Sequence, residues 1–260
     1  MKKMKSKRDI ALFQEFLLNS WPAHHYYFLN GWILRFTDGV TDRANSVFPI
    51  SYTGNQETLD EDIDIVEKAY KAHKLSPIFT IPEFHNPKNL EDKLSKRGYQ
   101  SYAFTTALGL EIDKVPLIQI STDVDFFFYD SRVDDFSHFI AKFSKRNKDQ
   151  QVTINGITNR IIIPKKCFLI AKSQNEVIGT LMGVLNPQGF LYIGDMLVHP
   201  HFRRQKVATS MLIKLIVDWA IPKDSKYIWL QVENDNFGAL NLYKRVGLKK
   251  LYSYYYMKIF

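Results

Sequence analysis

FLYIGDMLVHPHFRRQKVATSML, residues 190–212, is the stretch from which the fold of this 260-residue chain can be read. Residues 191–198 have the apolar character of a strand, and Pro200 ends it because proline cannot continue a β-ladder. A basic turn, residues 203–206, comes next. Apolar side chains then recur at helical spacing, at positions 208, 212, 215 and 219. The first turn of a helix has free backbone N–H groups, so this order of elements predicts an anion-binding site.

A second strand and helix follow further along the chain. Residues 227–232 are an apolar strand candidate, and we expect a helix over residues 238–245 with Gly247 as its C-cap. The spacing Asn236-x-x-Ala239-x-x-Leu242-Tyr243 spans this helix. An aromatic run, residues 251–260, predicts a last strand.

Together, the two motifs resemble the GNAT superfamily of acyl-CoA-dependent N-acetyltransferases, over about residues 168–260. The family turn reads roughly V-x-P-x-x-R-x-x-G-x-G/A, and this chain matches it with Val198, Pro200, Arg203 and Ala208. Lys206 stands where the family has a glycine. We expect coenzyme binding to survive, because a helix N-terminus attracts anions without that glycine and a lysine in helical conformation fits there. Weakened or lost binding is the alternative.

The resemblance implies a role for each residue of the motifs. It assigns the coenzyme to the turn and helix start, and the thioester carbonyl to a backbone N–H near Leu197 or Val198. Tyr243 is the candidate acid, since a hydroxyl with a reference pKa of about 10 suits protonation of a thiolate. Asn236 would bind the coenzyme or simply cap the following helix. The expected coenzyme-binding residues of the turn are Arg203, Arg204, Gln205, Lys206, Val207, Ala208 and Thr209.

The general base is open. Glu233, at the end of the second strand, and Asp195, on the first, are the two candidate carboxylates. Either could equally be a surface or capping residue. No group of side chains has metal-ligand spacing, so we expect no metal.

The order of elements in the first half of the chain repeats that of the second. We therefore expect an α/β (α+β) protein with two GNAT-like units, each a mixed, mostly antiparallel twisted sheet flanked by helices. The expected domains are residues 1–115 and 122–260, with a linker over 114–122. The first unit is expected to be degenerate, because its long helix opens with acidic residues and Leu94 occupies the slot of Tyr243. Residues 43–50 are expected to form its returning hairpin strand.

Composition limits the class of protein. A hydrophobic content of 45% is typical of a folded core, and one cysteine excludes a disulfide within the chain. No run is long enough to span a membrane, so we expect a cytoplasmic protein without a membrane partner. The net charge of +8 suits a polyanionic coenzyme. No nucleic-acid-binding motif is present, and nucleic acid is not an expected partner.

These observations predict an acetyl-CoA-dependent N-acetyltransferase acting on a primary amine of a small molecule or peptide, by direct attack within a ternary complex. One alternative is a non-catalytic GNAT-like module that binds a partner or senses the coenzyme, favoured by Lys206. Another is a transferase acting on charged tRNA, favoured by the charge. Neither the acceptor nor the oligomeric state can be read from the sequence.

Overall fold

A computed structural model describes residues 7–116, 118–120, 123–144 and 146–260. Parts of the expected linker 114–122 lie outside these residues. The chain packs into two compact units. The first contains the described residues up to 106 together with 251–260, and the second contains residues 107–250.

These units are not divided where the sequence suggested. Strand β10, Lys249–Lys258, was assigned to the second half, but most of it belongs to the first unit. It pairs antiparallel with β3, Phe79–Pro82, from Tyr254 opposite Pro82 to Met257 opposite Phe79. The pairing partner of an apolar strand is set by tertiary packing, which position along the chain does not reveal.

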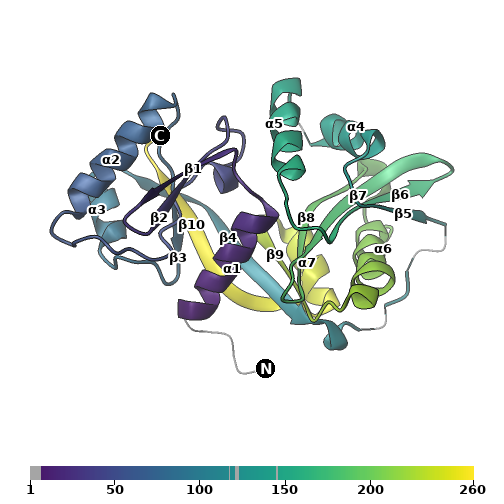
Figure 1. Ribbon diagram of the computed structural model, residues 1–260. Helices are drawn as coiled ribbons and strands as arrows, with labels where there is room; N and C mark the ends of the chain where they lie inside the picture. Colours follow the sequence, from purple (N-terminus) through teal and green to yellow (C-terminus); the bar gives the residue numbers. More distant parts are fainter. Residues whose placement is uncertain (1–6, 117, 121–122, 145) are drawn as a thin grey trace. The chain divides into compact units, whose positions relative to one another are not determined.

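The first unit combines a mixed set of helices and short strands around its own core (Figure 1). Its strand β10 lies between β3 and β4, and β1 pairs antiparallel with β2. Its remaining elements are α1 (Lys7–Ser20), β1 (His25–Leu29), β2 (Trp32–Phe36), η1 (Asp42–Ala44), α2 (Leu59–Ala72), α3 (Leu90–Lys96) and the start of β4 (Gln100–Glu111).

The returning strand expected over residues 43–50 was wrong. The chain forms the short 3-10 helix η1 there, followed by two isolated bridges, from Phe48 to Ile33 and from Val47 to Phe79. The Asn45 side chain accepts hydrogen bonds from the backbone N–H groups of Thr37 and Gly39 and donates to the carbonyls of Thr37 and Thr41. These bonds hold a compact turn, which replaces the ladder that a hairpin would have.

The acidic opening of α2 is neutralised within the first unit. Asp60 accepts hydrogen bonds from the side chains of Lys93 and Arg97. Asp62 accepts from the Tyr52 hydroxyl at 2.5 Å and from the Asn30 amide at 2.9 Å. Leu94, in the slot compared with Tyr243, is fully buried. This helix start offers carboxylates where an anion site needs free donors.

The second unit is built on the strand order β4-β9-β8-β7-β6-β5, with helices packed against the sheet (Figure 1). Strands β5 to β8 are antiparallel neighbours, and β8 pairs parallel with β9, so the mixed, mostly antiparallel sheet is confirmed. Its elements after β4 are η2 (Ile112–Lys114), β5 (Asp125–Tyr129), α4 (Asp134–Phe143), α5 (Lys148–Asn159), β6 (Lys166–Ser173), β7 (Glu176–Leu185), β8 (Phe190–Val198), η3 (Pro200–Phe202), α6 (Val207–Lys214), the π-helix η4 (Leu215–Ala220), η5 (Ile221–Lys223), β9 (Tyr227–Glu233) and α7 (Phe237–Val246).

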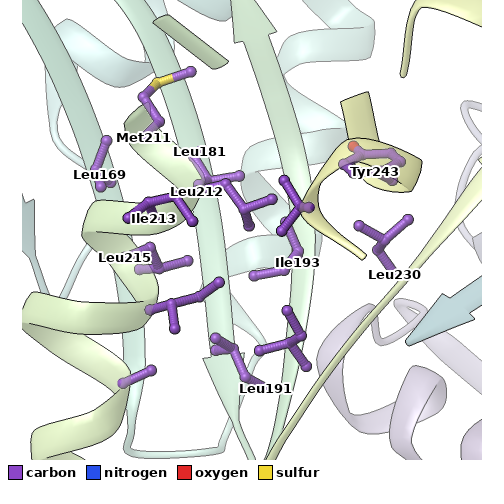
Figure 2. Close-up of a cluster of buried hydrophobic side chains, with 14 of the residues drawn as sticks. Leu169, Leu181, Leu191, Ile193, Met211, Leu212, Ile213, Leu215, Leu230 and Tyr243 are labelled. Carbon is purple, nitrogen blue, oxygen red and sulfur yellow. The ribbon is translucent and has the colours of Figure 1, made fainter. Parts of the chain in front are cut away.

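The core of this unit lies between its sheet and helix α6. Leucine and isoleucine side chains of β6, β7 and β8 face those of α6 and η4, and Tyr243 of α7 joins the same cluster (Figure 2). Gly179 and Gly183 of β7 make room for this packing. A Cβ at Gly179 would lie 2.9 Å from the Met211 sulfur, and one at Gly183 would lie 2.9 Å from a Leu215 methyl. The two glycines therefore allow α6 and η4 to approach the sheet closely.

Candidate active site

The two central strands of the second unit, β8 and β9, are paired over only the first half of their length. The parallel ladder between β8 and β9 runs from Phe190 opposite Tyr227 to Ile193 opposite Leu230. Strand β8 continues to Val198 and β9 to Glu233. Beyond Ile193 and Leu230, the ladder between the two strands stops. A strand edge that is not paired with its neighbour can hydrogen-bond an extended ligand.

A β-bulge lies where the strands separate. Thr180 of β7 is opposite Leu197 of β8, and Met182 is opposite Gly194, so β8 advances three residues while β7 advances two. We call residues 194–197 the bulge. Asp195 within it has φ 45°, in the left-handed region that non-glycine residues rarely adopt. Bulges of this kind re-aim backbone groups next to active sites.

Two arginines surround the Asp195 carboxylate. A terminal nitrogen of Arg132 lies 3.2 Å from one Asp195 oxygen, and a terminal nitrogen of Arg146 lies 3.9 Å from the other. The Arg132 side chain is 2% exposed and that of Asp195 is 8% exposed, so this pair is buried. Burial lowers the pKa of Arg132, and the Asp195 charge opposes that change. Asp195 is thus a carboxylate already engaged in a buried ion pair.

The basic turn and the start of α6 present a run of unused donors. Arg203 donates from Nε to the Val198 carbonyl at 3.3 Å, and its own N–H bonds the Pro200 carbonyl. The first helical bond of α6 runs from the Ser210 N–H to the Lys206 carbonyl. Within the described chain, the six backbone N–H groups of residues 204–209 make no hydrogen bond. We call these six groups the donor run.

The side chains of the basic turn are exposed and cationic. Arg203, Arg204 and Lys206 are exposed beside the donor run, and Gln205 donates from its side chain to the His201 carbonyl at 2.7 Å. The turn therefore combines free N–H groups, a helix N-terminus and three positive charges. That combination is complementary to a pyrophosphate.

Lys206 does not have the helical conformation that the sequence reasoning required. It has φ 64° and ψ 2°, in the left-handed region, and it stands at the N-cap of α6. Arg204 is also left-handed, with φ 62°. The glycine of the family motif is therefore explained by backbone conformation, because glycine adopts a positive φ without strain.

Tyr243 reaches from α7 towards the point where the strands separate. Its side chain is 7% exposed and shares a buried cluster with Ile193 and Leu230, the last paired residues of β8 and β9 (Figure 2). Burial raises the pKa of the Tyr243 hydroxyl, with a smaller contribution from Tyr192. Among the described residues, this hydroxyl has no hydrogen-bond partner. It is therefore protonated at neutral pH and uncommitted to the fold.

Asn236 and Glu233 are exposed and lie between the end of β9 and the start of α7. The Asn236 side chain accepts from the Ala239 N–H at 3.2 Å, so it caps α7, as one of the two readings of this residue expected. Glu233 ends β9 and is exposed. Of the two candidate bases, Asp195 has arginine partners, whereas Glu233 has no arginine within ion-pair distance in the described part of the chain.

Sequence reasoning missed Arg132 and Arg146. They stand 63 and 49 residues before Asp195 and belong to no motif, so only the folded chain brings them to the bulge. The described residues contain no group of side chains arranged to hold a metal ion. No helix among them is both long and apolar enough to cross a membrane.

Residues 127–248, which contain every element of this site, match the model of the Acetyltransferase (GNAT) family. This chain contains a GNAT acetyltransferase domain. The superfamily inferred from the two motifs is thereby confirmed, and the family assignment is that of an N-acetyltransferase. Residues 12–98 match a second model, described as "Probable histone acetyltransferase Rv0428c C-terminal".

Relatives of known sequence and structure agree with this assignment. The chain is 24% identical to an uncharacterized N-acetyltransferase, YobR, of Bacillus subtilis, over 95% of this chain and 98% of that protein. Its fold is similar to that of a GCN5-related N-acetyltransferase from Kribbella flavida, with a TM-score of 0.67 at 12% identity, covering 96% and 95% of the two chains. A tandem GNAT protein from the clavulanic acid biosynthesis pathway matches with a TM-score of 0.59 at 10% identity, covering 79% and 70%.

Proposed function

We propose that the GNAT domain transfers an acetyl group from acetyl-CoA to a primary amine of a small molecule or peptide, by direct attack within a ternary complex. The observation that carries this proposal is the donor run, residues 204–209, beside three exposed cations. Backbone N–H groups at a helix N-terminus fit the pyrophosphate of the coenzyme. The separated edges of β8 and β9 fit an extended pantetheine chain, which can hydrogen-bond as a strand does.

In this proposal the bulge and Tyr243 act on the reacting atoms. A backbone N–H of Leu197 or Val198 donates to the thioester carbonyl oxygen and stabilises the negative charge that develops there. The amine nitrogen attacks the carbonyl carbon, the C–S bond breaks, and Tyr243 protonates the departing sulfur. Burial keeps the hydroxyl in its donor form. The same burial makes it a weak acid, so it donates as the C–S bond breaks rather than ionising beforehand.

We assign the base to Glu233, acting directly or through a water molecule on the attacking amine. We do not assign the base to Asp195, because its carboxylate is already paired with Arg132. The first unit is proposed to bind no coenzyme, since its equivalent helix start is acidic and internally paired. We also propose a cytoplasmic location, for which the single buried thiol, Cys167, is the support.

The test of coenzyme binding is a thermal shift. Coenzyme A should raise the melting temperature of the wild-type protein by mass action, and Arg204→Glu should abolish the shift. Arg245→Glu is the matched control, because it makes the same charge change at an exposed arginine at the end of α7. Absence of any shift in the wild type at millimolar coenzyme would remove the transferase proposal.

The test of catalysis separates an enzyme from the rival function, a coenzyme-sensing module. Thiol release from acetyl-CoA is measured against a panel of amines for the wild type and for Tyr243→Phe. The Phe variant should lose about two orders of magnitude in turnover, the contribution of one positioned acid. Its coenzyme affinity should be kept, because the donor run is untouched. Coenzyme binding without thiol release for any amine would favour the sensing module.

A further inference from the structure

The bulge is the part of β8 with the least support from the sheet. The parallel ladder to β9 ends at Ile193, immediately before it, and the antiparallel ladder to β7 shifts register across it. Asp195 holds a left-handed conformation, which is strained for a residue with a Cβ. A strained backbone persists only where neighbouring groups over-determine it, so something other than the ladder must fix residues 194–197.

The Asp195 side chain is anchored by one rigid group. Besides its contact with Asp195, Arg132 donates from Nε to the Ser137 hydroxyl at 3.2 Å, and its guanidinium carbon lies 4.8 Å from the centre of the Phe136 ring. Phe136 and Ser137 belong to the first turns of α4. The Arg132 guanidinium therefore contacts Ser137 and Phe136 of α4 and also the Asp195 carboxylate, so it links α4 to the bulge.

Burial makes this link sensitive to the loss of either partner. Removing one member of a buried ion pair leaves an uncompensated charge in a medium that solvates it poorly. The bulge would then relax so that the remaining group reaches water. Arg146 offers only partial replacement, because its nitrogen is 3.9 Å from Asp195 and its side chain is 28% exposed.

We propose that Arg132 is a positioning residue for catalysis: through Asp195 it holds residues 194–197 in the conformation that aims the backbone N–H of Leu197 or Val198 at the thioester carbonyl. This inference rests on the proposed function for its catalytic consequence. Its structural half, that the Arg132–Asp195 pair fixes the bulge, stands without it. Arg132 acts here through Asp195 and does not touch the reacting atoms.

The experiment compares Arg132→Met, Asp195→Asn, the double variant, and Asp135→Asn as control. Asp135 also lies on α4 and also pairs across to the sheet, with Lys172, but that pair is exposed and Lys172 lies on β6, which β7 separates from the bulge. Amide hydrogen exchange of the peptide containing residues 194–198 should quicken at least about tenfold in both single variants and stay unchanged in the control.

Kinetics supply the second measurement. The turnover number should fall by about tenfold to a hundredfold in each single variant, part of what the loss of a whole oxyanion donor costs. The dissociation constant of coenzyme A should stay within about twofold, because the donor run is separate. The double variant should be no slower than the worse single variant, since both break one interaction. Arg132→Lys, which keeps the charge but not the fork, covers the case in which Arg132→Met does not fold.

Three results would overturn the proposal. One is amide hydrogen exchange of residues 194–198 that is no faster in Arg132→Met than in the control. If Arg132→Met does not fold, Arg132→Lys takes its place in this comparison. Another is a pair of turnover losses that multiply in the double variant. The third is a loss of coenzyme affinity that accounts for the loss of rate. If the wild type turns over no substrate, the proposed function fails, and the exchange experiment still decides whether the pair holds the bulge.

Discussion

Replacing Lys206 with glycine and with alanine separates the backbone from the charge at the basic turn. Lys206 has φ 64°, and a left-handed residue with a Cβ costs about 1–2 kcal/mol relative to the right-handed helix. Glycine avoids that strain but loses about 0.5–1 kcal/mol more conformational entropy on folding. Both variants lack the ammonium, so charge cancels in the comparison. We expect Lys206→Gly to be more stable than Lys206→Ala by about 0.5–1 kcal/mol.

Lys214 provides the control, because there the alanine variant is expected to be more stable than the glycine variant. It ends α6 with φ −61° and ψ −45°, and it pairs on the surface with Asp218 at 2.8 Å. Glycine and alanine both remove that pair, and alanine should be the more stable of the two by up to about 1 kcal/mol because the backbone is helical. The assay is urea unfolding of the four variants at one pH. The same order at both positions would refute the conformational account of Lys206.

Coenzyme affinity measured on the same variants reports the charge. Lys206→Ala should weaken coenzyme A binding by about twofold to fivefold, the range that one exposed ion contact supplies, and added salt should shrink the difference. Lys206→Gly should bind no worse than Lys206→Ala. An increase in affinity for either variant would mean that the lysine obstructs the turn rather than assisting it.

Three further predictions follow from the site and its surroundings. Asn236→Ala should cost about 1 kcal/mol of stability through loss of the α7 cap, and unchanged unfolding would contradict the capping role. Calorimetry should give one coenzyme site per chain, whereas two sites would assign one to the first unit. Burial raises the pKa of the Cys167 thiol to about 12 and also raises that of Tyr243, so both groups favour folding while protonated. The contribution of these two groups to stability should be constant below about pH 8. The urea midpoint should then fall as pH rises beyond the pKa values of the unfolded groups, and less steeply in Cys167→Ala.

The features that the sequence predicted are those encoded by neighbouring residues. Proline at position 200 ends β8, Gly247 with φ 93° ends α7, and Asn236 caps that helix. Periodicity likewise placed the start of α6 and both ends of β9 within a residue, while the last helical positions, 215 and 219, lie in the π-helix η4 that follows α6. Each of these signals acts over a few residues, where chain stiffness and local hydrogen bonds dominate.

The features that it did not predict depend on residues far apart. The Arg132–Asp195 pair joins positions 63 residues apart, and β10 reaches back to β3. The choice between Asp195 and Glu233 as base also needed the fold, because only a tertiary contact shows which carboxylate is already paired. Lys206 was misjudged for a related reason: residue type alone does not give φ, and the helical conformation assumed for it is not the one adopted.

Backbone groups, rather than side chains, form most of this candidate site, and that explains why a lysine can stand in a glycine position. The six N–H groups of the donor run and the N–H aimed by the bulge are present whatever the side chains are. What the sequence must supply is conformation, and three residues with positive φ, Asp195, Arg204 and Lys206, lie within this short stretch. Each of these residues is strained, and its surroundings must hold it in place. The ion pair with Arg132 does so for Asp195, and the start of α6 does so for the turn. Substitutions that loosen these supports should therefore reduce activity more than substitutions of equal size among the exposed charges around them.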